Sequence, residues 1–208
     1  MKNRNYSLLR QEQYRMLATL TFHGVILDLG GNKASVYHEL MNGVHRIESA
    51  NINPEYGCDF VFDVGEGFPL DGNAYNHIVC LNLLEHVYNF PNVIAESYRV
   101  LKHDGMLVLS VPFMHHIHAS PDDYFRYTAS ALRCALVDVG FKEVAITELG
   151  FGLFSLIYQT IQGAVPRLIR PSLQRCFVGC DKLLLRLSGR YRAVAKRIPL
   201  GYFVVAKK

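Results

Sequence analysis

The sequence lacks long apolar runs. Nowhere do about 18 apolar residues follow one another, which predicts no transmembrane helix. The first 24 residues contain Arg10, Glu12 and Arg15 and no apolar stretch of signal-peptide type, so we expect no secretory leader. The five cysteines are odd in number and lie at unrelated spacings, which indicates reduced thiols in a cytoplasmic protein and excludes a disulfide framework.

Acidic residues are scarce near the C-terminus. Residues 151–208 contain 11 Lys and Arg but a single acid, Asp181, which gives a net charge of +10. Residues 1–150 contain 11 Lys and Arg and 17 Asp and Glu, a net charge of −6. Such a split predicts that the C-terminal part meets something anionic, although a basic face exposed to water would give the same pattern.

What is present is enough for one domain with a large core. The chain has 208 residues, of which half are hydrophobic, and internal repeats are absent. Short apolar runs, together with one more polar run, predict seven strands, mostly buried on both faces as in a parallel sheet. These strands are expected at residues 25–29, 46–52, 60–62, 78–81, 107–111, 144–146 and 202–206.

Helical patterns fall between the later strands. Pro91 is expected near the start of a helix that ends before Asp104 and Gly105, with Leu101 on its buried stripe. Thr128 is expected to cap a helix that Gly140 closes. The alternation predicts an α/β fold with a doubly wound, mostly parallel seven-stranded sheet. Two further helices, at about 151–164 and 173–188, form a basic helical insertion before the last strand; Ser172 should cap the second of these helices, and Gly189 should end it.

Polar residues and glycines follow the predicted strands, where ligands bind in such sheets. The first strand leads into Asp28, Gly30 and Gly31, and a glycine turn lets the backbone approach a ligand closely. The second strand ends near Asn51, at the distance from Asp28 where dinucleotide folds place a ribose-binding side chain. The third ends at Asp63, which is placed to accept a hydrogen bond from an adenine amino group.

The fourth strand ends in the segment LNLLEHV at residues 81–87, and RVLKHDG follows at residues 99–105. With these motifs the chain resembles the class I S-adenosylmethionine-dependent methyltransferases, of the small-molecule "LEHV" type that is methyltransferase type 11-like. The resemblance covers about residues 24–148 and implies the Rossmann-like methyltransferase fold, S-adenosyl-L-methionine as cofactor and an antiparallel last strand. It implies cofactor contacts by Asp28, Gly30, Gly31, Asn51, Asp63 and Asn82.

Three asparagines depart from the family pattern. Asn32 occupies the second glycine position of the turn, Asn51 replaces an acid, and Asn76 replaces the aspartate that usually opens the fourth strand. We expect Asn32 to be able to adopt a left-handed backbone. At position 51, a hydrogen bond from ribose to a neutral amide instead of a carboxylate costs about 1 kcal/mol of binding free energy, which weakens cofactor binding without abolishing it.

The loop after the fifth strand contains the candidates for acceptor chemistry. A subset of such methyltransferases has a run similar to residues 118–128, H-x-x-P-x-D-Y-x-R-Y-T. We expect His118 to be the general base, with Asp123 or Tyr124 orienting it or the acceptor. The alternative is structural: Asp123 pairs with Arg126, Thr128 caps a helix, and His118 is a loop residue.

No metal is expected. His115, His116 and His118 with Asp122 form an alternative metal site, but no remote cysteine or histidine completes a zinc spacing. Cys176 and Cys180 are expected to be small core residues. His86, beside Glu85 at the cofactor edge, is expected to be either catalytic or a structural capping or packing residue.

The sequence therefore predicts a methyltransferase domain over 1–208, comprising an N-terminal helix (1–23), a cofactor-binding core (24–148), the basic insertion or lid (149–200) and the last strand (201–208). The expected acceptor is a small molecule, a sugar or a lipid-linked intermediate; the alternative function is an inactive methyltransferase-like scaffold. The insertion, with a net charge of +8, is a candidate for contact with an anionic membrane, which would add a peripheral position on the inner membrane face to a cytoplasmic location. Sparse aromatic residues among its basic ones disfavour nucleic acid.

Overall fold

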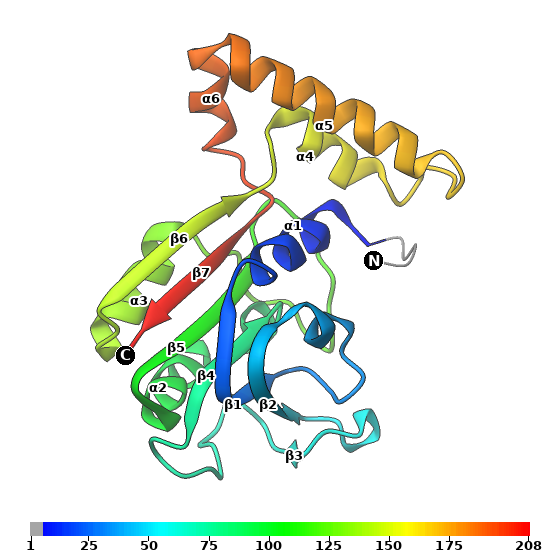
Figure 1. Cartoon of the computed structure of the whole chain (residues 1–208). Coiled ribbons are helices and arrows are strands. Elements are labelled where there is room, and N and C mark those ends of the chain that lie inside the picture. The colour runs from blue at the N-terminus through cyan, green and yellow to red at the C-terminus, as the bar shows by residue number, and fades with distance from the viewer. Residues whose placement is uncertain (1–5) are drawn as a thin grey trace.

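The computed structural model describes residues 6–208 and is built on one twisted sheet (Figure 1). Seven strands lie in the order β3–β2–β1–β4–β5–β7–β6, and β7 runs antiparallel to both of its neighbours. The predicted doubly wound α/β fold is therefore confirmed, as are all seven predicted strands. The strands are β1 (Thr21–Leu29), β2 (Asn42–Asn51), β3 (Phe60–Val61), β4 (Tyr75–Leu81), β5 (Leu101–Pro112), β6 (Glu143–Leu149) and β7 (Gly201–Lys207).

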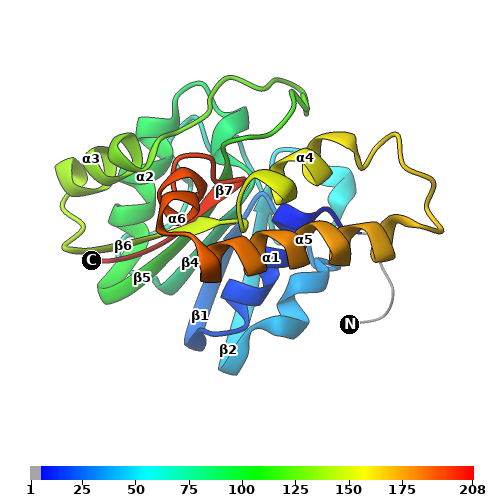
Figure 2. The same ribbon diagram turned by 90° about the horizontal axis from the view of Figure 1, so that it is seen from above.

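Helices cover both faces of the sheet, and Figure 2 shows them on opposite sides of the strands. On one face α2 (Phe90–Val100) and α3 (Ala129–Val139) pack with the largest core cluster. On the other face α1 (Leu8–Leu17) packs in a second cluster with residues of α4 (Leu153–Ile161) and α5 (Arg170–Leu187). Short 3-10 turns, η1 (Val36–Leu40), η2 (Pro54–Tyr56) and η3 (Leu84–His86), stand after β1, β2 and β4.

Two predicted helix boundaries are wrong. The helix that begins near Pro91 ends at Val100, because Leu101 is extended and pairs with Tyr75 of β4 as the first residue of β5. The second insertion helix begins at Arg170, three residues before the predicted start, since Pro171 fits the first turn of a helix. That helix ends at Leu187, and Ser188 caps a further helix, α6 (Gly189–Ala195), of which Gly189 is the first residue.

The insertion is held together by its single acid. Asp181 of α5 is fully buried and accepts hydrogen bonds from the backbone N–H groups of Phe154 (3.0 Å) and Ser155 (2.6 Å). These donors lie in the first turn of α4, where a negative charge is favoured by the helix dipole. The Tyr191 hydroxyl of α6 also donates to Asp181, so one carboxylate joins all three helices.

The insertion leaves the sheet after β6 and returns to it through β7, and α5 is its outermost helix (Figure 1). In the part of the chain that the structure describes, every helix is too short or too polar to cross a lipid bilayer.

Candidate functional site

A large cavity lies at the carboxyl ends of β1, β2, β3 and β4, where ligands bind in open α/β sheets. Its volume is about 840 Å³, within the range of small-molecule sites. Of the six predicted cofactor contacts, the structure brings Gly30, Asn51, Asp63 and Asn82 together in its wall. Asp28 and Gly31 are buried and are not among the residues that line the cavity.

The glycine turn is shaped by a buried carboxylate. Asp28 is fully buried, accepts hydrogen bonds from the Tyr37 hydroxyl (2.8 Å to each oxygen) and lies 2.7 Å from Nε2 of His38. Burial raises the pKa of Asp28, and these two partners oppose the rise. A Cβ on Gly31 would stand 1.8 Å from Oδ2 of Asp28, so only glycine fits there. Gly30 has φ +79° and gives the turn its left-handed step.

The three asparagines that depart from the family pattern have different roles. The Asn51 amide donates to the carbonyls of Gly30 (3.0 Å) and Gly31 (3.2 Å), bonds that the family's carboxylate cannot make. Asn32 does not take the expected left-handed backbone; its side chain accepts from the N–H of Ala34 instead. The Asn76 side chain accepts a hydrogen bond from the N–H of Val25 toward the amino-terminal ends of β1 and β4, away from the cavity.

The lining fits S-adenosylmethionine in its chemistry. Asp63 presents a carboxylate that accepts one internal hydrogen bond, from the Gly65 N–H at 2.7 Å, which leaves acceptor capacity for an amino group. Apolar and aromatic side chains beside it suit a purine ring: Ile52, Tyr56, Phe62, Val64 and Leu83. Gly30 and Asn51 offer close backbone approach and a polar side chain at the other strand ends.

Helix α1 contacts the end of β4 beside the cavity, a feature that no pattern in the sequence predicts. The Gln13 amide is fully buried and exchanges hydrogen bonds with the Asn82 amide at 2.6 and 3.0 Å. It also donates to the Ser110 hydroxyl at 3.0 Å. Asn82 has φ +52°, so its side chain meets α1 from a left-handed backbone. Arg10, one turn earlier on the helix, lines the cavity as well.

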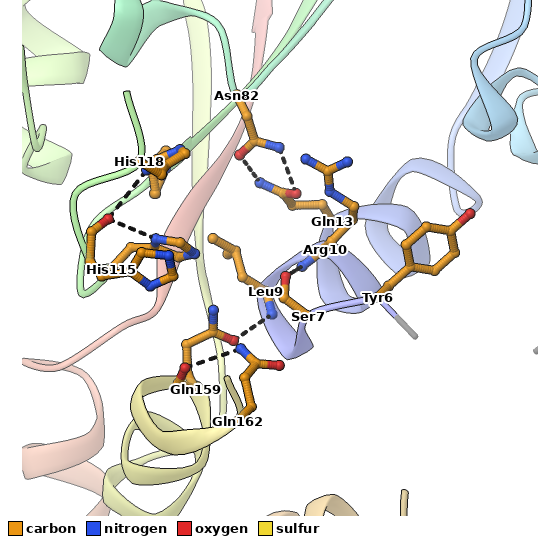
Figure 3. A pocket seen from close by; sticks show the side chains of 12 residues that line it. Tyr6, Ser7, Leu9, Arg10, Gln13, Asn82, His115, His118, Gln159 and Gln162 are labelled. Atoms are coloured by element: carbon orange, nitrogen blue, oxygen red, sulfur yellow. Dashed lines mark hydrogen bonds between the residues drawn. The ribbon is translucent and has the colours of Figure 1, made fainter. Parts of the chain in front are cut away.

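A second, smaller cavity of about 350 Å³ adjoins the first (Figure 3). Arg10, Asn82 and His118 line both cavities, so the two meet at these side chains. Figure 3 shows Gln159 and Gln162 entering from α4, opposite His115 and His118. Nε2 of Gln159 is buried and has no hydrogen-bond partner among residues 6–208. The insertion thus supplies one wall of this cavity.

His118 is held by the acids and carbonyls around it. Its backbone N–H donates to Oδ2 of Asp123 (2.9 Å), and its Nδ1 lies 3.3 Å from the same oxygen and 3.2 Å from the carbonyl of His116. Contact with the Glu85 carboxylate raises the pKa of His118. Asp123 also pairs with Arg126, which holds the pKa of its carboxyl well below the usual range.

The catalytic and the structural interpretations of residues 118–128 are both compatible with the contacts of this loop. The Asp123–Arg126 ion pair and the Thr128 cap of α3 exist, as the structural alternative requires. Asp123 nevertheless fixes His118 at the point where the cavities meet. Tyr124 lines the larger cavity, and its hydroxyl donates to Asp122 at 2.9 Å.

Comparisons with known proteins agree with this geometry. Residues 29–109 match the family model of a methyltransferase domain. A methyltransferase from Archaeoglobus fulgidus is 15% identical with TM-score 0.58, and covers 96% of this chain and 91% of its own. A Thermotoga maritima protein, described as a possible histamine N-methyltransferase, is 12% identical with TM-score 0.61 and coverages of 97% and 90%.

A third similar structure contains a bound product of the cofactor. Phosphoethanolamine N-methyltransferase 2 of Haemonchus contortus, in complex with phosphomonomethylethanolamine and S-adenosylhomocysteine, is 11% identical with TM-score 0.57. The match covers 94% of this chain and 52% of that one. No curated protein matches the sequence. The strand order, the cavity at the strand ends and the likeness to these structures together show the class I methyltransferase fold, and residues 29–109 of the chain match a methyltransferase domain.

Proposed function

We propose that this methyltransferase acts on a small polar acceptor held in the cavity between α1, α4 and the His115–His118 loop. The observation that supports it most directly is that this cavity meets the cofactor cavity at Arg10, Asn82 and His118. Two adjoining cavities, one for each reactant, give the proximity on which methyl transfer depends. S-adenosylmethionine, when bound, supplies a methyl group on a positively charged sulfur.

In this proposal Gly30, Asn51, Asp63 and Asn82 line the cofactor site. Gly31 and Asp28 support it from behind: Gly31 leaves room for the Asp28 carboxylate, and Asp28 fixes the turn through Tyr37 and His38. The predicted direct contacts of Asp28 and Gly31 with the cofactor are thereby revised to indirect support.

His118 takes the proton of the acceptor. The neighbours of Nδ1, a carboxylate and a carbonyl, favour a proton on that nitrogen, which leaves the lone pair on Nε2. Nearby Glu85 stabilises the imidazolium that results, and this contact accounts for the raised pKa of His118. Asp123 positions the ring, and Tyr124 lines the cofactor side of the junction.

The acceptor is an oxygen-rich molecule, of the sugar or lipid-linked sugar class. Its cavity offers one buried hydrogen-bond donor without an internal partner in the described chain, Nε2 of Gln159, and the guanidinium of the exposed Arg10 lines it as well. Such donors are costly to bury unless a ligand oxygen accepts from them. Most of the residues that line this cavity have polar side chains, and Leu9 and Pro112 are its aliphatic residues.

A membrane would present such a lipid-linked acceptor. The outer face of α5 has basic residues next to exposed apolar ones, among them Leu183 and Leu187, which are 56% and 74% exposed. Leu168, in the preceding loop, is 91% exposed. No basic residue of 151–200 forms an ion pair among the described residues, because Asp181 is buried inside the insertion. A cationic surface with apolar side chains suits an anionic lipid surface, which supports the proposal of a cytoplasmic protein with a peripheral position on the inner membrane face.

The first experiment is calorimetric titration with S-adenosylmethionine and S-adenosylhomocysteine, followed by labelled methyl transfer to a panel of glycans and lipid-linked sugars. The His118→Asn variant should lower kcat at saturating cofactor about 100-fold, as expected for loss of a general base. His103→Asn, an exposed histidine at the far end of β5, is the matched control. An unchanged kcat in His118→Asn would remove the base assignment, and cofactor binding without any turnover would favour the scaffold alternative.

Co-sedimentation with liposomes tests the membrane surface separately. Binding should rise with the fraction of anionic lipid and fall with added salt. The Leu183→Ser and Leu187→Ser double variant should bind less while keeping its affinity for S-adenosylhomocysteine. Equal sedimentation with neutral and anionic vesicles would exclude this surface as a membrane contact.

A further inference from the structure

Glu85 is the most unusual charged group in the described chain. Its side chain is 0% exposed, and neither carboxylate oxygen has a hydrogen-bond partner among residues 6–208. A buried carboxylate without partners costs several kcal/mol in general, so it is retained only where something compensates its charge. No other carboxylate among those residues is both fully buried and without a hydrogen bond, because Asp28 and Asp181 each accept several.

Two imidazole nitrogens face this carboxylate. Nε2 of His118 lies 3.6 Å from Oε1 of Glu85, and Nε2 of His86 lies 3.8 Å from the same oxygen. All three ligand atoms lie within 4.8 Å of one another. The two rings stand nearly perpendicular, with their centroids 5.0 Å apart. Both histidines line the larger cavity, so the cluster is reached from it.

The hydrogen bonds behind the rings leave these nitrogens with free lone pairs. Nδ1 of His86 lies 2.5 Å from the Asp122 carbonyl, and Nδ1 of His118 lies 3.2 Å from the His116 carbonyl. A carbonyl only accepts, so Nδ1 holds the proton in each ring and Nε2 presents its lone pair. This is the arrangement of metal-binding histidines, in which a carbonyl or carboxylate orients the ring through its other nitrogen.

We propose that Glu85, His86 and His118 form a binding site for a divalent transition-metal cation of the zinc class. Two imidazoles and one carboxylate are a donor set for zinc, iron, manganese, cobalt or nickel, whereas magnesium and calcium require mostly oxygen ligands. A cation between the three groups balances the buried charge and accepts both lone pairs. Bonds near 2 Å to a zinc-like cation would require the three ligand atoms to move toward one another by no more than about 2 Å.

A bound cation and the proton of the acceptor would compete for Nε2 of His118. Nε2 of His118 has one lone pair, which binds either the proton of an acceptor or the metal. Occupation of this site therefore blocks the proton transfer assigned to His118. The site is nevertheless testable on its own, since binding is measured without cofactor and without acceptor.

The test is titration of the purified, tag-free full chain with cobalt(II), followed by its visible absorption and by calorimetry. We expect one cation per chain, with a d–d absorption band that zinc(II) abolishes by competition and magnesium(II) does not. Glu85→Gln and His86→Asn should each weaken cobalt affinity at least about 10-fold. Glu85→Gln keeps the shape of the side chain and removes its buried charge, so it should fold.

His116→Asn is the matched control, because this histidine lies in the same loop but outside the three-residue cluster. It should leave cobalt affinity and stoichiometry unchanged. The proposal is overturned by the absence of saturable binding, by binding that survives both Glu85→Gln and His86→Asn, or by a loss of binding in His116→Asn. The last outcome would point to the His115–His116–His118 alternative instead.

Discussion

Substitution of Gly31 by alanine tests how the cofactor turn is built. The added Cβ would stand 1.8 Å from Oδ2 of Asp28 and 2.6 Å from the Tyr37 hydroxyl, far inside contact distance. Either the carboxylate leaves its partners or the turn moves outward. Gly31 lies outside the left-handed region, so the backbone angle itself adds no penalty.

The structure sets the size of the effect. Asp28 is bound to Tyr37 and faces His38, and a hydrogen bond to a charged group is worth about 1.5–3 kcal/mol. Loss or distortion of one or two such bonds predicts a decrease of about 2–4 kcal/mol in the free energy of unfolding. An outward shift of the turn by about 1 Å narrows the cofactor cavity and should weaken S-adenosylhomocysteine binding about 10- to 100-fold.

Urea unfolding followed by circular dichroism and calorimetric titration with S-adenosylhomocysteine measure these effects. Gly67→Ala is the matched control, because an added Cβ there meets nothing within 4 Å. In an Asp28→Ala background the clash with the carboxylate is relieved and only the contact with the Tyr37 hydroxyl remains, so Gly31→Ala should cost less there than in the parent protein. A Gly31→Ala protein within about 0.5 kcal/mol of the parent, with unchanged affinity, would refute the reasoning.

Three further predictions concern other parts of the molecule. Burial, with His23 and another histidine nearby, lowers the pKa of His77 to about 4. As the pH falls, His77 is therefore protonated in the unfolded chain at a higher pH than in the folded protein. The free energy of unfolding should fall by up to about 3 kcal/mol as the pH drops from 6.5 to 4. Urea titrations should show that this dependence on pH is smaller in His77→Phe. Gln13→Leu leaves the Asn82 amide without its partner, which should cost about 1–3 kcal/mol in urea unfolding and weaken S-adenosylhomocysteine binding in calorimetry. Asn51→Asp restores the acid of the family pattern but opposes two carbonyls, so it should destabilise the protein by about 1 kcal/mol; a rise in both stability and cofactor affinity would contradict this.

The sheet was predictable because its signals are local. Every strand except β2 has an apolar run, and the order of strands and helices allows few topologies. Boundaries were harder where apolar residues continue from one element into the next. Leu101 fits the stripe of α2 by spacing, yet it pairs with Tyr75 in the sheet, and only the tertiary structure decides between the two.

The lining of the larger cavity at the strand ends was predictable for the same reason. Gly30, Asn51, Asp63 and Asn82 directly follow strands, and parallel strands bring their carboxyl ends to one edge. The burial of Asp28 behind the turn was not predictable from its position alone, and its contact with the cofactor stays a prediction. Its side chain alternates to the side of the sheet where Tyr37 and His38 lie, and burial there keeps it from the cavity wall.

The smaller cavity depends on contacts between distant parts of the chain, which no local sequence pattern predicts. Leu9 of α1 donates its N–H to Gln159 of α4 at 3.4 Å, across a separation of 150 residues. Gln11 and Gln174 exchange hydrogen bonds at 3.1 and 2.8 Å and thereby join α1 to α5. The N-terminal helix is thus fixed between the sheet and the insertion, and the smaller cavity exists only where the three meet.

This arrangement has a consequence for acceptor choice. The cofactor wall comes from strand ends of the common sheet, whereas Gln159 and Gln162 come from the insertion and Arg10 from α1. If the two cavities have the roles proposed above, changes in the insertion should alter the acceptor without disturbing the cofactor site, because the cavities share only Arg10, Asn82 and His118. The same insertion presents the basic outer face of α5. The proposed membrane surface and the proposed acceptor wall would then belong to one insertion, whose three helices are joined through the buried carboxylate of Asp181.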